Sequence, residues 1–425
     1  MGRRAVQVLR SNAFWGWCIL LICMELLGIA LANGAARGFD FRAFYAAGHI
    51  VRTDASHLYS LGVQEQVQSA FVSPSQAVIP FYHPAYEALF YLPLSFLRYQ
   101  TAYLVYIAAN ILLLGIALLI APFHSSFPLA KRSRAAAFFL FLPALFTILE
   151  GQDSIVFLVI CCLVLRELRR GDELLAGLFL GLAVFRPQLA VPLAILLACR
   201  LGWRFLAGFA SMAAPLTLLC GIMMKRQGLA ALYAMLGKAS MVQDHTAAAQ
   251  RAIAVYPQRM PNLYGLLYAC AGRFMTPSRS FLLTAIASLV LFAVCVFVIR
   301  RSHSLANTFG VAALGTALLS YHLYAYDATI LLLPILLLSS RIHFYLVIVC
   351  YVLPYVLFFG GQSGWFCIYA TVPLALLFVA IARILSHHSD RRRISGSGRP
   401  VAAFETGVAP ELVSVRPSST STAAR

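Results

Sequence analysis

Polar side chains that could move a proton or hold an anion occur at five separated places in an otherwise apolar sequence. They are Asp40 with Arg42, His83, the turn Gly151-Gln152-Asp153, the segment Arg186-Pro187-Gln188, and His322 with Asp327. Ionisable groups in apolar surroundings cost free energy and therefore tend to mark functional sites. A carboxylate beside cations and aromatic residues such as Tyr45 suits one reaction in particular. It can deprotonate a hydroxyl group while the cations hold a phosphate leaving group.

Each of these side chains also has a purely structural explanation. Asp40 belongs to a residue type that often caps the N-terminus of a helix. Gln152 and Asp153 suit a tight turn between two helices. Arg186 could extend to lipid headgroups, and His322 could belong to an aromatic belt at the membrane interface. The sequence leaves these alternatives open.

The elements that position these residues are predicted to be membrane helices. Of the 425 residues, 61% are hydrophobic and 11% are charged, whereas soluble domains carry about 25% charged residues. The formal net charge of +18 is divided among short basic clusters between apolar stretches. This distribution is typical of membrane orientation and not of a nucleic-acid-binding surface. We therefore predict an all-α polytopic membrane protein with no nucleic-acid partner.

Apolar stretches, several of them shorter than the roughly 20 residues that cross a bilayer, predict about twelve transmembrane helices. The first is 13–32, and the others lie near 100–121, 135–150, 153–168, 173–187, 188–200, 205–224, 280–300, 305–321, 325–340, 342–358 and 364–384. Alternating them from a cytoplasmic N-terminus puts the basic clusters inside. The transmembrane domain then covers residues 1–384, with outside loops at 33–99 and 225–279. Residues 385–425 are predicted to form a disordered cytoplasmic tail.

Several common catalytic motifs are missing from the sequence. It has no GxxxxGK[ST] phosphate loop, no HExxH zinc motif and no GxSxG elbow, which argues against ATP hydrolysis, zinc proteolysis and serine hydrolysis. The ten cysteines contain no CxxC pair, so neither a zinc site nor a disulfide framework is indicated. No second carboxylate accompanies Asp40 along the chain. We therefore expect no cofactor and assign no metal-binding residue, while the sequence leaves the metal requirement open.

Several sequence blocks together resemble glycosyltransferase family 87. They are the DFRAFYAAG block at 40–48, His57-Leu58-Tyr59, Phe81-Tyr82-His83-Pro84, GQDS at 151–154, FRPQ at 185–188, MPNLYGLL at 260–267 and SYHLYAYD at 320–327. Their order and spacing carry the resemblance, which extends over roughly 13–384. Two positions depart from the family pattern. Members commonly have Lys where this chain has Arg186, and a second Pro where it has His83.

The resemblance implies a GT-C-type glycosyltransferase fold and a polyprenyl-phosphate-mannose-dependent mannosyltransferase, similar to enzymes that elongate phosphatidylinositol mannosides. It implies that the catalytic Asp of the first outside loop is Asp40. The enzyme would move a hexose, expected to be mannose, to a lipid or glycan acceptor with inversion. Its site would face the outside or periplasm from a multi-pass position in the bacterial cytoplasmic (inner) membrane.

These expectations give each candidate residue a role. Asp40 is the general base, and Arg186, His322 and Arg259 are candidates for holding the donor phosphate, which leaves as a stable anion. The remaining substrate-site candidates are Arg42, Tyr45, His83, Gln152, Asp153, Gln188 and Asp327. The main alternative function is a polytopic transporter or lipid flippase, although no internal repeat is evident. A non-catalytic scaffold in envelope assembly is a third hypothesis.

Overall fold

The structure is a computed structural model, and it describes residues 40–71, 78–121, 131–241, 256–338, 344–359 and 363–396. Over these residues the chain is helical and contains no strand, as the all-α prediction expects. The predicted first span at 13–32 lies outside the described residues. So do parts of both predicted outside loops and the tail beyond residue 396.

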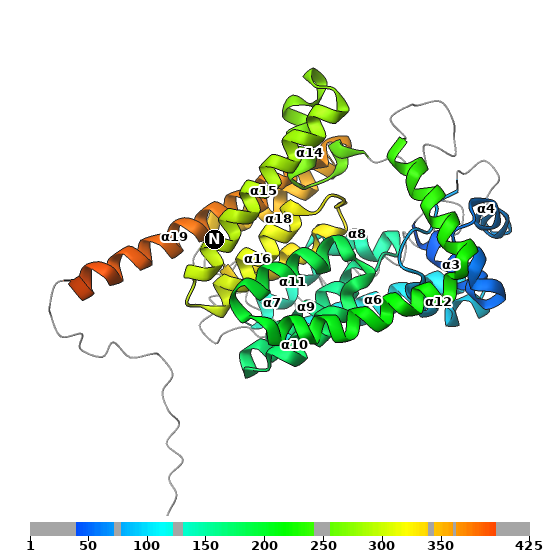
Figure 1. Ribbon diagram of the computed structural model, residues 1–425, viewed down its shortest axis with the longest axis horizontal. Helices are drawn as coiled ribbons and strands as arrows, with labels where there is room; N and C mark the ends of the chain where they lie inside the picture. Colours follow the sequence, from blue (N-terminus) through cyan, green and yellow to red (C-terminus); the bar gives the residue numbers. More distant parts are fainter. Residues whose placement is uncertain are drawn as a thin grey trace, which may run out of the picture.

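Short helices from the first predicted loop gather at one end of the molecule, beside one end of the long helix α12 (Trp203–Met241) (Figure 1). They are α3 (Phe41–Asp54), η1 (Ala55–His57), α4 (Leu61–Ser69), η2 (Ala85–Glu87), α5 (Ala88–Tyr91) and η3 (Pro93–Phe96). The backbone N–H of Tyr86 donates to Cys220 Sγ at 3.4 Å. This contact joins the predicted loop to α12.

The first half of the helical bundle consists of α6 (Tyr99–Ile120), α7 (Lys131–Phe139), α8 (Leu142–Glu150), α9 (Ser154–Arg170), α10 (Glu173–Leu182), η4 (Ala183–Phe185), α11 (Pro187–Leu201) and α12. The second half consists of η5 (Pro257–Arg259), α14 (Leu263–Ala271), η6 (Gly272–Phe274), α15 (Pro277–Arg301), α16 (Leu305–Leu319), η7 (Asp327–Leu331), α17 (Leu332–Leu338), α18 (Phe344–Phe359), η9 (Ser363–Ala370) and α19 (Thr371–Gly396). Helix α19 therefore continues past residue 385, where the sequence predicted the tail to begin, and it projects from the bundle (Figure 1).

Four helices in the described part of the chain are long and apolar enough to cross a membrane: Tyr99–Ile120, Trp203–Ala234, Ser278–Arg301 and Phe366–Ser386. They support a helical membrane protein but not twelve full-length spans. The predicted span 135–150, for example, is divided between α7 and α8 by a break at Leu140 and Phe141. Apolar composition predicts burial, but it does not reveal such a break. A short helix shielded by neighbouring helices does not have to cross the bilayer.

Helix α12 contains one break in its own backbone. Lys225 has φ of 52° and ψ of −170°, and the helix resumes after it. A residue other than glycine rarely adopts positive φ, so Lys225 separates the apolar part of α12 from the part that follows. The predicted second outside loop began at this same residue.

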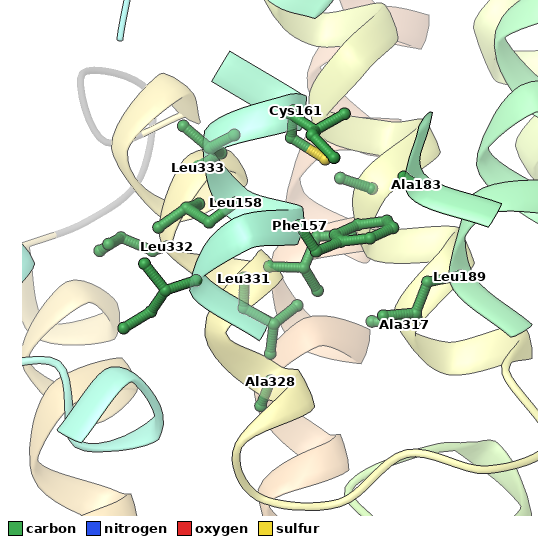
Figure 2. Close-up of a cluster of buried hydrophobic side chains, with 14 of the residues drawn as sticks. Phe157, Leu158, Cys161, Ala183, Leu189, Ala317, Ala328, Leu331, Leu332 and Leu333 are labelled. Carbon is green, nitrogen blue, oxygen red and sulfur yellow. The ribbon is translucent and has the colours of Figure 1, made fainter. Parts of the chain in front are cut away.

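A tightly packed apolar core lies behind the polar residues. Figure 2 shows Phe157 and Leu158 of α9 among Leu189 of α11 and Leu331 of η7, and all four side chains are at most 1% exposed. Interiors packed at this density leave little freedom for the helices to shift. The polar residues that precede or begin α9, α11 and η7 are thereby held in fixed relative positions.

Helices α10 and α12 pack against each other backbone to backbone. A Cβ atom added to Gly208 would lie 2.0 Å from the carbonyl oxygen of Leu174, and one added to Gly177 would lie 2.0 Å from that of Phe205. Small residues allow membrane helices to approach this closely. Because α10 leads through η4 directly to Arg186, this close helix crossing fixes the position of the Arg186 backbone.

We expect Gly208→Ala to lower the melting temperature of the purified protein. The added methyl group has no space, and overpacking of this kind costs about 1–3 kcal/mol. Gly221→Ala, on the same helix, is the matched control because its Cβ would meet no atom within 4 Å. Thermal unfolding of both variants in detergent checks the prediction. Equal melting temperatures would contradict the close crossing.

Candidate active site

The guanidinium group of Arg186 lies at the centre of the polar cluster. It donates hydrogen bonds to the carboxylates of Asp153 and Asp327, and its Nη2 donates to Gln152 Oε1 at 2.7 Å. Its Cζ lies 5.5 Å from the centre of the Tyr326 ring. Arg186 is 2% exposed, so it does not extend to lipid headgroups. Two carboxylates balance its buried charge.

Asp40 joins this cluster through Gln152. It directly precedes α3, but its side chain makes no capping hydrogen bond there. Instead, Asp40 Oδ2 accepts a hydrogen bond from Gln152 Nε2 at 2.6 Å. Burial raises the pKa of Asp40, while this hydrogen bond and the positive charges of Arg42 and Arg186 act in the opposite direction. A carboxylate with a raised pKa is a stronger proton acceptor than an ordinary Asp.

A second carboxyl group, Glu150, lies close to Asp40, although the sequence did not predict it as a site residue. It is the last residue of α8, directly before Gly151, whose φ of 69° lies in the left-handed region. Burial raises the pKa of Glu150 to about 8, and the charge of Asp40 adds to this effect. Glu150 belongs to no recognisable motif, and a Glu at the end of an apolar helix commonly lies at the surface. The one feature of the sequence that could have indicated it is its position directly before the GQDS block.

A third group of ionisable side chains surrounds His83. His83 Nδ1 lies 2.9 Å from Glu87 Oε2 and 3.9 Å from Asp153 Oδ2, and the His83 carbonyl accepts a hydrogen bond from the Tyr59 hydroxyl at 2.6 Å. Burial lowers the pKa of His83 to about 3, so its imidazole is neutral at pH 7. Burial also raises the pKa of Glu87 well above its ordinary value, and the Asp153 carboxylate contributes to that rise.

His322 and Arg259 lie at the edge of the cluster among tyrosines. The His322 ring lies 4.7 Å from that of Tyr324 and 6.2 Å from that of Tyr82, centre to centre. Burial lowers the pKa of His322 to about 4, with the charge of Arg186 contributing, so His322 is also neutral at pH 7. Arg259 is exposed, and its Cζ lies 5.0 Å from the Tyr256 ring centre.

The other predicted residues differ in how closely they approach this cluster. Arg42 is buried, and its charge acts on Asp40. The Tyr45 hydroxyl donates to the Leu97 carbonyl at 2.7 Å, which makes Tyr45 a packing residue of the loop helices. Gln188 lies half-buried in the first turn of α11. The structure thus brings all five polar segments together around Arg186, with Asp327 in direct contact and His322 at the edge.

Comparison with models of known protein families matches residues 81–321 to glycosyltransferase family 87. The matched region is more than half of the chain. The chain belongs to glycosyltransferase family 87. No curated protein and no solved structure matches it.

Membership of family 87 makes this membrane protein a glycosyltransferase, which needs a sugar donor and an acceptor. The match confirms the resemblance that the sequence blocks indicated. It includes His83, Asp153 and Arg186, whereas Asp40 precedes it and Asp327 follows it. The contacts of Arg186 and Gln152 are therefore what tie these two outer residues to the part of the chain that matches the family.

Proposed function

We propose that this family 87 glycosyltransferase moves a hexose, specifically mannose, from a polyprenyl-phosphate donor to a lipid or glycan acceptor. We further propose a GT-C-type fold and a site on the outer face of the bacterial cytoplasmic membrane. The observation that carries the proposal is the hydrogen-bonded chain from Asp40 through Gln152 to Arg186. It provides one oriented carboxylate among apolar membrane helices, as transfer from a lipid-linked donor requires.

Asp40 is the proposed general base. Gln152 orients its carboxylate, and Arg186 in turn holds the carbonyl end of the Gln152 amide. Asp40 would accept the proton of the acceptor hydroxyl while that oxygen forms a bond to the anomeric carbon. The bond from the anomeric carbon to the phosphate oxygen breaks on the opposite face of the sugar. Polyprenyl phosphate leaves as an anion, and the configuration inverts.

The contacts of Arg186 favour a role for it other than the phosphate binding that the sequence suggested. The guanidinium of Arg186 already donates to Asp153, Asp327 and Gln152. We therefore propose that Arg186 positions Gln152 and, through it, Asp40. The donor phosphate would instead contact the exposed Arg259 and the neutral imidazole of His322, which can donate a hydrogen bond.

A transfer assay tests the proposed function against the transporter alternative. Purified protein is incubated with a radiolabelled polyprenyl-phosphate hexose and a membrane lipid extract. We expect the label to move into a new glycolipid or glycan that resists the mild acid that releases sugar from the donor. If the label only crosses the membrane of reconstituted vesicles and stays on the donor, the protein is a transporter.

We expect the acid limb of the kcat/KM profile to report Asp40. Activity should be complete above the pKa of Asp40 and lost as the pH falls through it. Because burial raises that pKa, the limb should lie above the ordinary value of 3.8. Arg42→Gln removes a charge that lowers the pKa, so it should move the limb to higher pH. Glu150→Gln is the matched control, because Glu150, whose pKa is raised to about 8, is already neutral across the limb, so this variant should leave the limb in place.

Profiles of the wild type and these two variants check the assignment. An acid limb that stays in place in Arg42→Gln, or a wild-type limb at or below the ordinary value, would contradict Asp40 as the titrating base.

A further inference from the structure

His83, Glu87 and Asp153 form a compact group of potential metal ligands that the proposed transfer mechanism does not use. One ligand atom from each residue lies within 4.8 Å of the other two. His83 lies at a bend directly before Pro84, and Glu87 follows in η2. Asp153 comes from the distant turn between α8 and α9. The tertiary fold therefore assembles the group.

Two carboxylate oxygens in this group have no hydrogen-bond partner within the described part of the chain: Glu87 Oε1 and Asp153 Oδ2. Glu87 is 2% exposed and Asp153 is 3% exposed, so protein atoms exclude bulk water from both. Buried polar atoms without partners are costly, and each one needs an explanation. Asp153 Oδ1 is held by Arg186, which leaves Oδ2 on the side of His83.

We propose that His83, Glu87 and Asp153 bind a divalent transition-metal ion, Mn²⁺ or Zn²⁺. One imidazole nitrogen and two carboxylate oxygens form a donor set that suits these ions, whereas Mg²⁺ and Ca²⁺ prefer oxygen alone. Such ligand atoms lie about 3–4 Å apart around an ion at about 2.1 Å. The distances of 2.9 and 3.9 Å from His83 Nδ1 to the two carboxylates fit this spacing.

The surroundings of His83 favour this role. The Tyr59 hydroxyl holds its carbonyl, and the Phe44 ring packs edge-on at 4.9 Å between ring centres. The imidazole is therefore held in place with Nδ1 toward both carboxylates. Three protein ligands leave further coordination positions for water or a substrate oxygen.

Metal content of the purified protein tests the proposal without any measurement of transfer. The full chain is purified through a tag without histidine, incubated with Mn²⁺ or Zn²⁺, and freed of unbound ion. We expect about one ion per chain, and a loss of at least tenfold in affinity for His83→Ala and Glu87→Gln, since even outer-shell changes cost about 10–100-fold. Titration followed by the Mn²⁺ electron paramagnetic resonance signal, and a parallel Zn²⁺ titration, decide between the two ions.

His57→Ala is the matched control. His57 Nδ1 pairs with Asp54 at 3.2 Å, but both side chains are about half exposed, and this pair is not part of the three-residue group. The control should bind metal as the wild type does. The ion should raise the melting temperature of the wild type and His57→Ala in a concentration-dependent way, and leave those of His83→Ala and Glu87→Gln unchanged.

Two results would overturn the proposal. One is a wild-type protein that shows no saturable binding of either ion, a result that does not depend on how well any variant folds. The other is a folded His83→Ala or Glu87→Gln variant that binds as much metal as the wild type. Neither result bears on whether the protein transfers a sugar, so the metal site and the proposed function can fail separately.

Discussion

Asp40→Asn is expected to slow glycosyl transfer by about 10²–10⁴-fold, the usual contribution of a general base, while donor-lipid binding is retained. Asn has nearly the same size as Asp, and its side-chain oxygen can still accept the hydrogen bond from Gln152. It cannot take a proton from the acceptor hydroxyl. Measurements on the same purified variant should therefore show a reduced turnover and an unchanged affinity for the donor.

Asp54→Asn is the matched control for this substitution. Asp54 also belongs to the first predicted loop, but it is half exposed and accepts the Ser56 backbone N–H at 2.9 Å as a helix cap. Asn caps helices about as well as Asp, so this variant should turn over at the wild-type rate. Near-normal turnover of Asp40→Asn would show that Asp40 has only a structural role at the start of α3.

Arg186→Ala is expected to lower both stability and rate. Removing one partner of a buried ion pair typically costs 3–5 kcal/mol, and here both Asp153 and Asp327 lose their cation. Gln152 also loses the group that holds its carbonyl end, so Asp40 is no longer oriented. Misplacement of a reacting group by about 1 Å can cost roughly 10²-fold in rate. Melting temperature and steady-state kinetics measure the two effects.

Arg186→Lys separates positioning from direct phosphate binding. Lys keeps the positive charge but lacks the planar fork that donates to three groups at once. If Arg186 positions Gln152, the Lys variant should recover stability in part and keep a wild-type KM for the donor, with kcat still reduced. A raised donor KM with unchanged kcat would instead place Arg186 on the phosphate. Arg259→Ala, which changes an exposed cation, should raise KM without changing the melting temperature.

Much of the architecture followed from residue types and their order. Low charge and long apolar stretches predicted an all-helical membrane protein, because lipid requires backbone groups to be satisfied within helices. The placement of basic clusters predicted that the polar segments share one side of the membrane, and this topology stays a prediction. Gln152 contacts both Asp40 and Arg186, although these residues are far apart in the sequence.

The helix boundaries could not be obtained in the same way. A break such as the one between α7 and α8 depends on local backbone geometry and on shielding by other helices, whereas apolar composition reports only burial. Glu150 and Glu87 were also missed, because an isolated Glu in an apolar run forms no motif. Each gains its chemical meaning from a tertiary neighbour, Asp40 for Glu150 and His83 for Glu87.

The proposed metal site could not be predicted from the sequence for the same reason. Metal motifs are recognised in a sequence when ligands recur at short, regular spacing. The proposed ligands do not recur in this way, because Asp153 lies in the turn between α8 and α9, far along the chain from His83 and Glu87. His83 was noticed as a departure from the family pattern, but its neighbours become visible only once the chain is folded.

The break at Lys225 suggests the depth at which the proposed site would lie in a bilayer. From Arg204 to Lys225, α12 rises about 30 Å, which equals the thickness of the hydrocarbon layer. We infer that the two cations would lie near the two headgroup planes. Cys220, just before the break, contacts Tyr86, the residue before Glu87, so the proposed site would lie close to one of these planes. A lipid-linked phosphate already resides at that level, and it could reach the site by lateral diffusion alone while its hydrocarbon chain stays in the membrane.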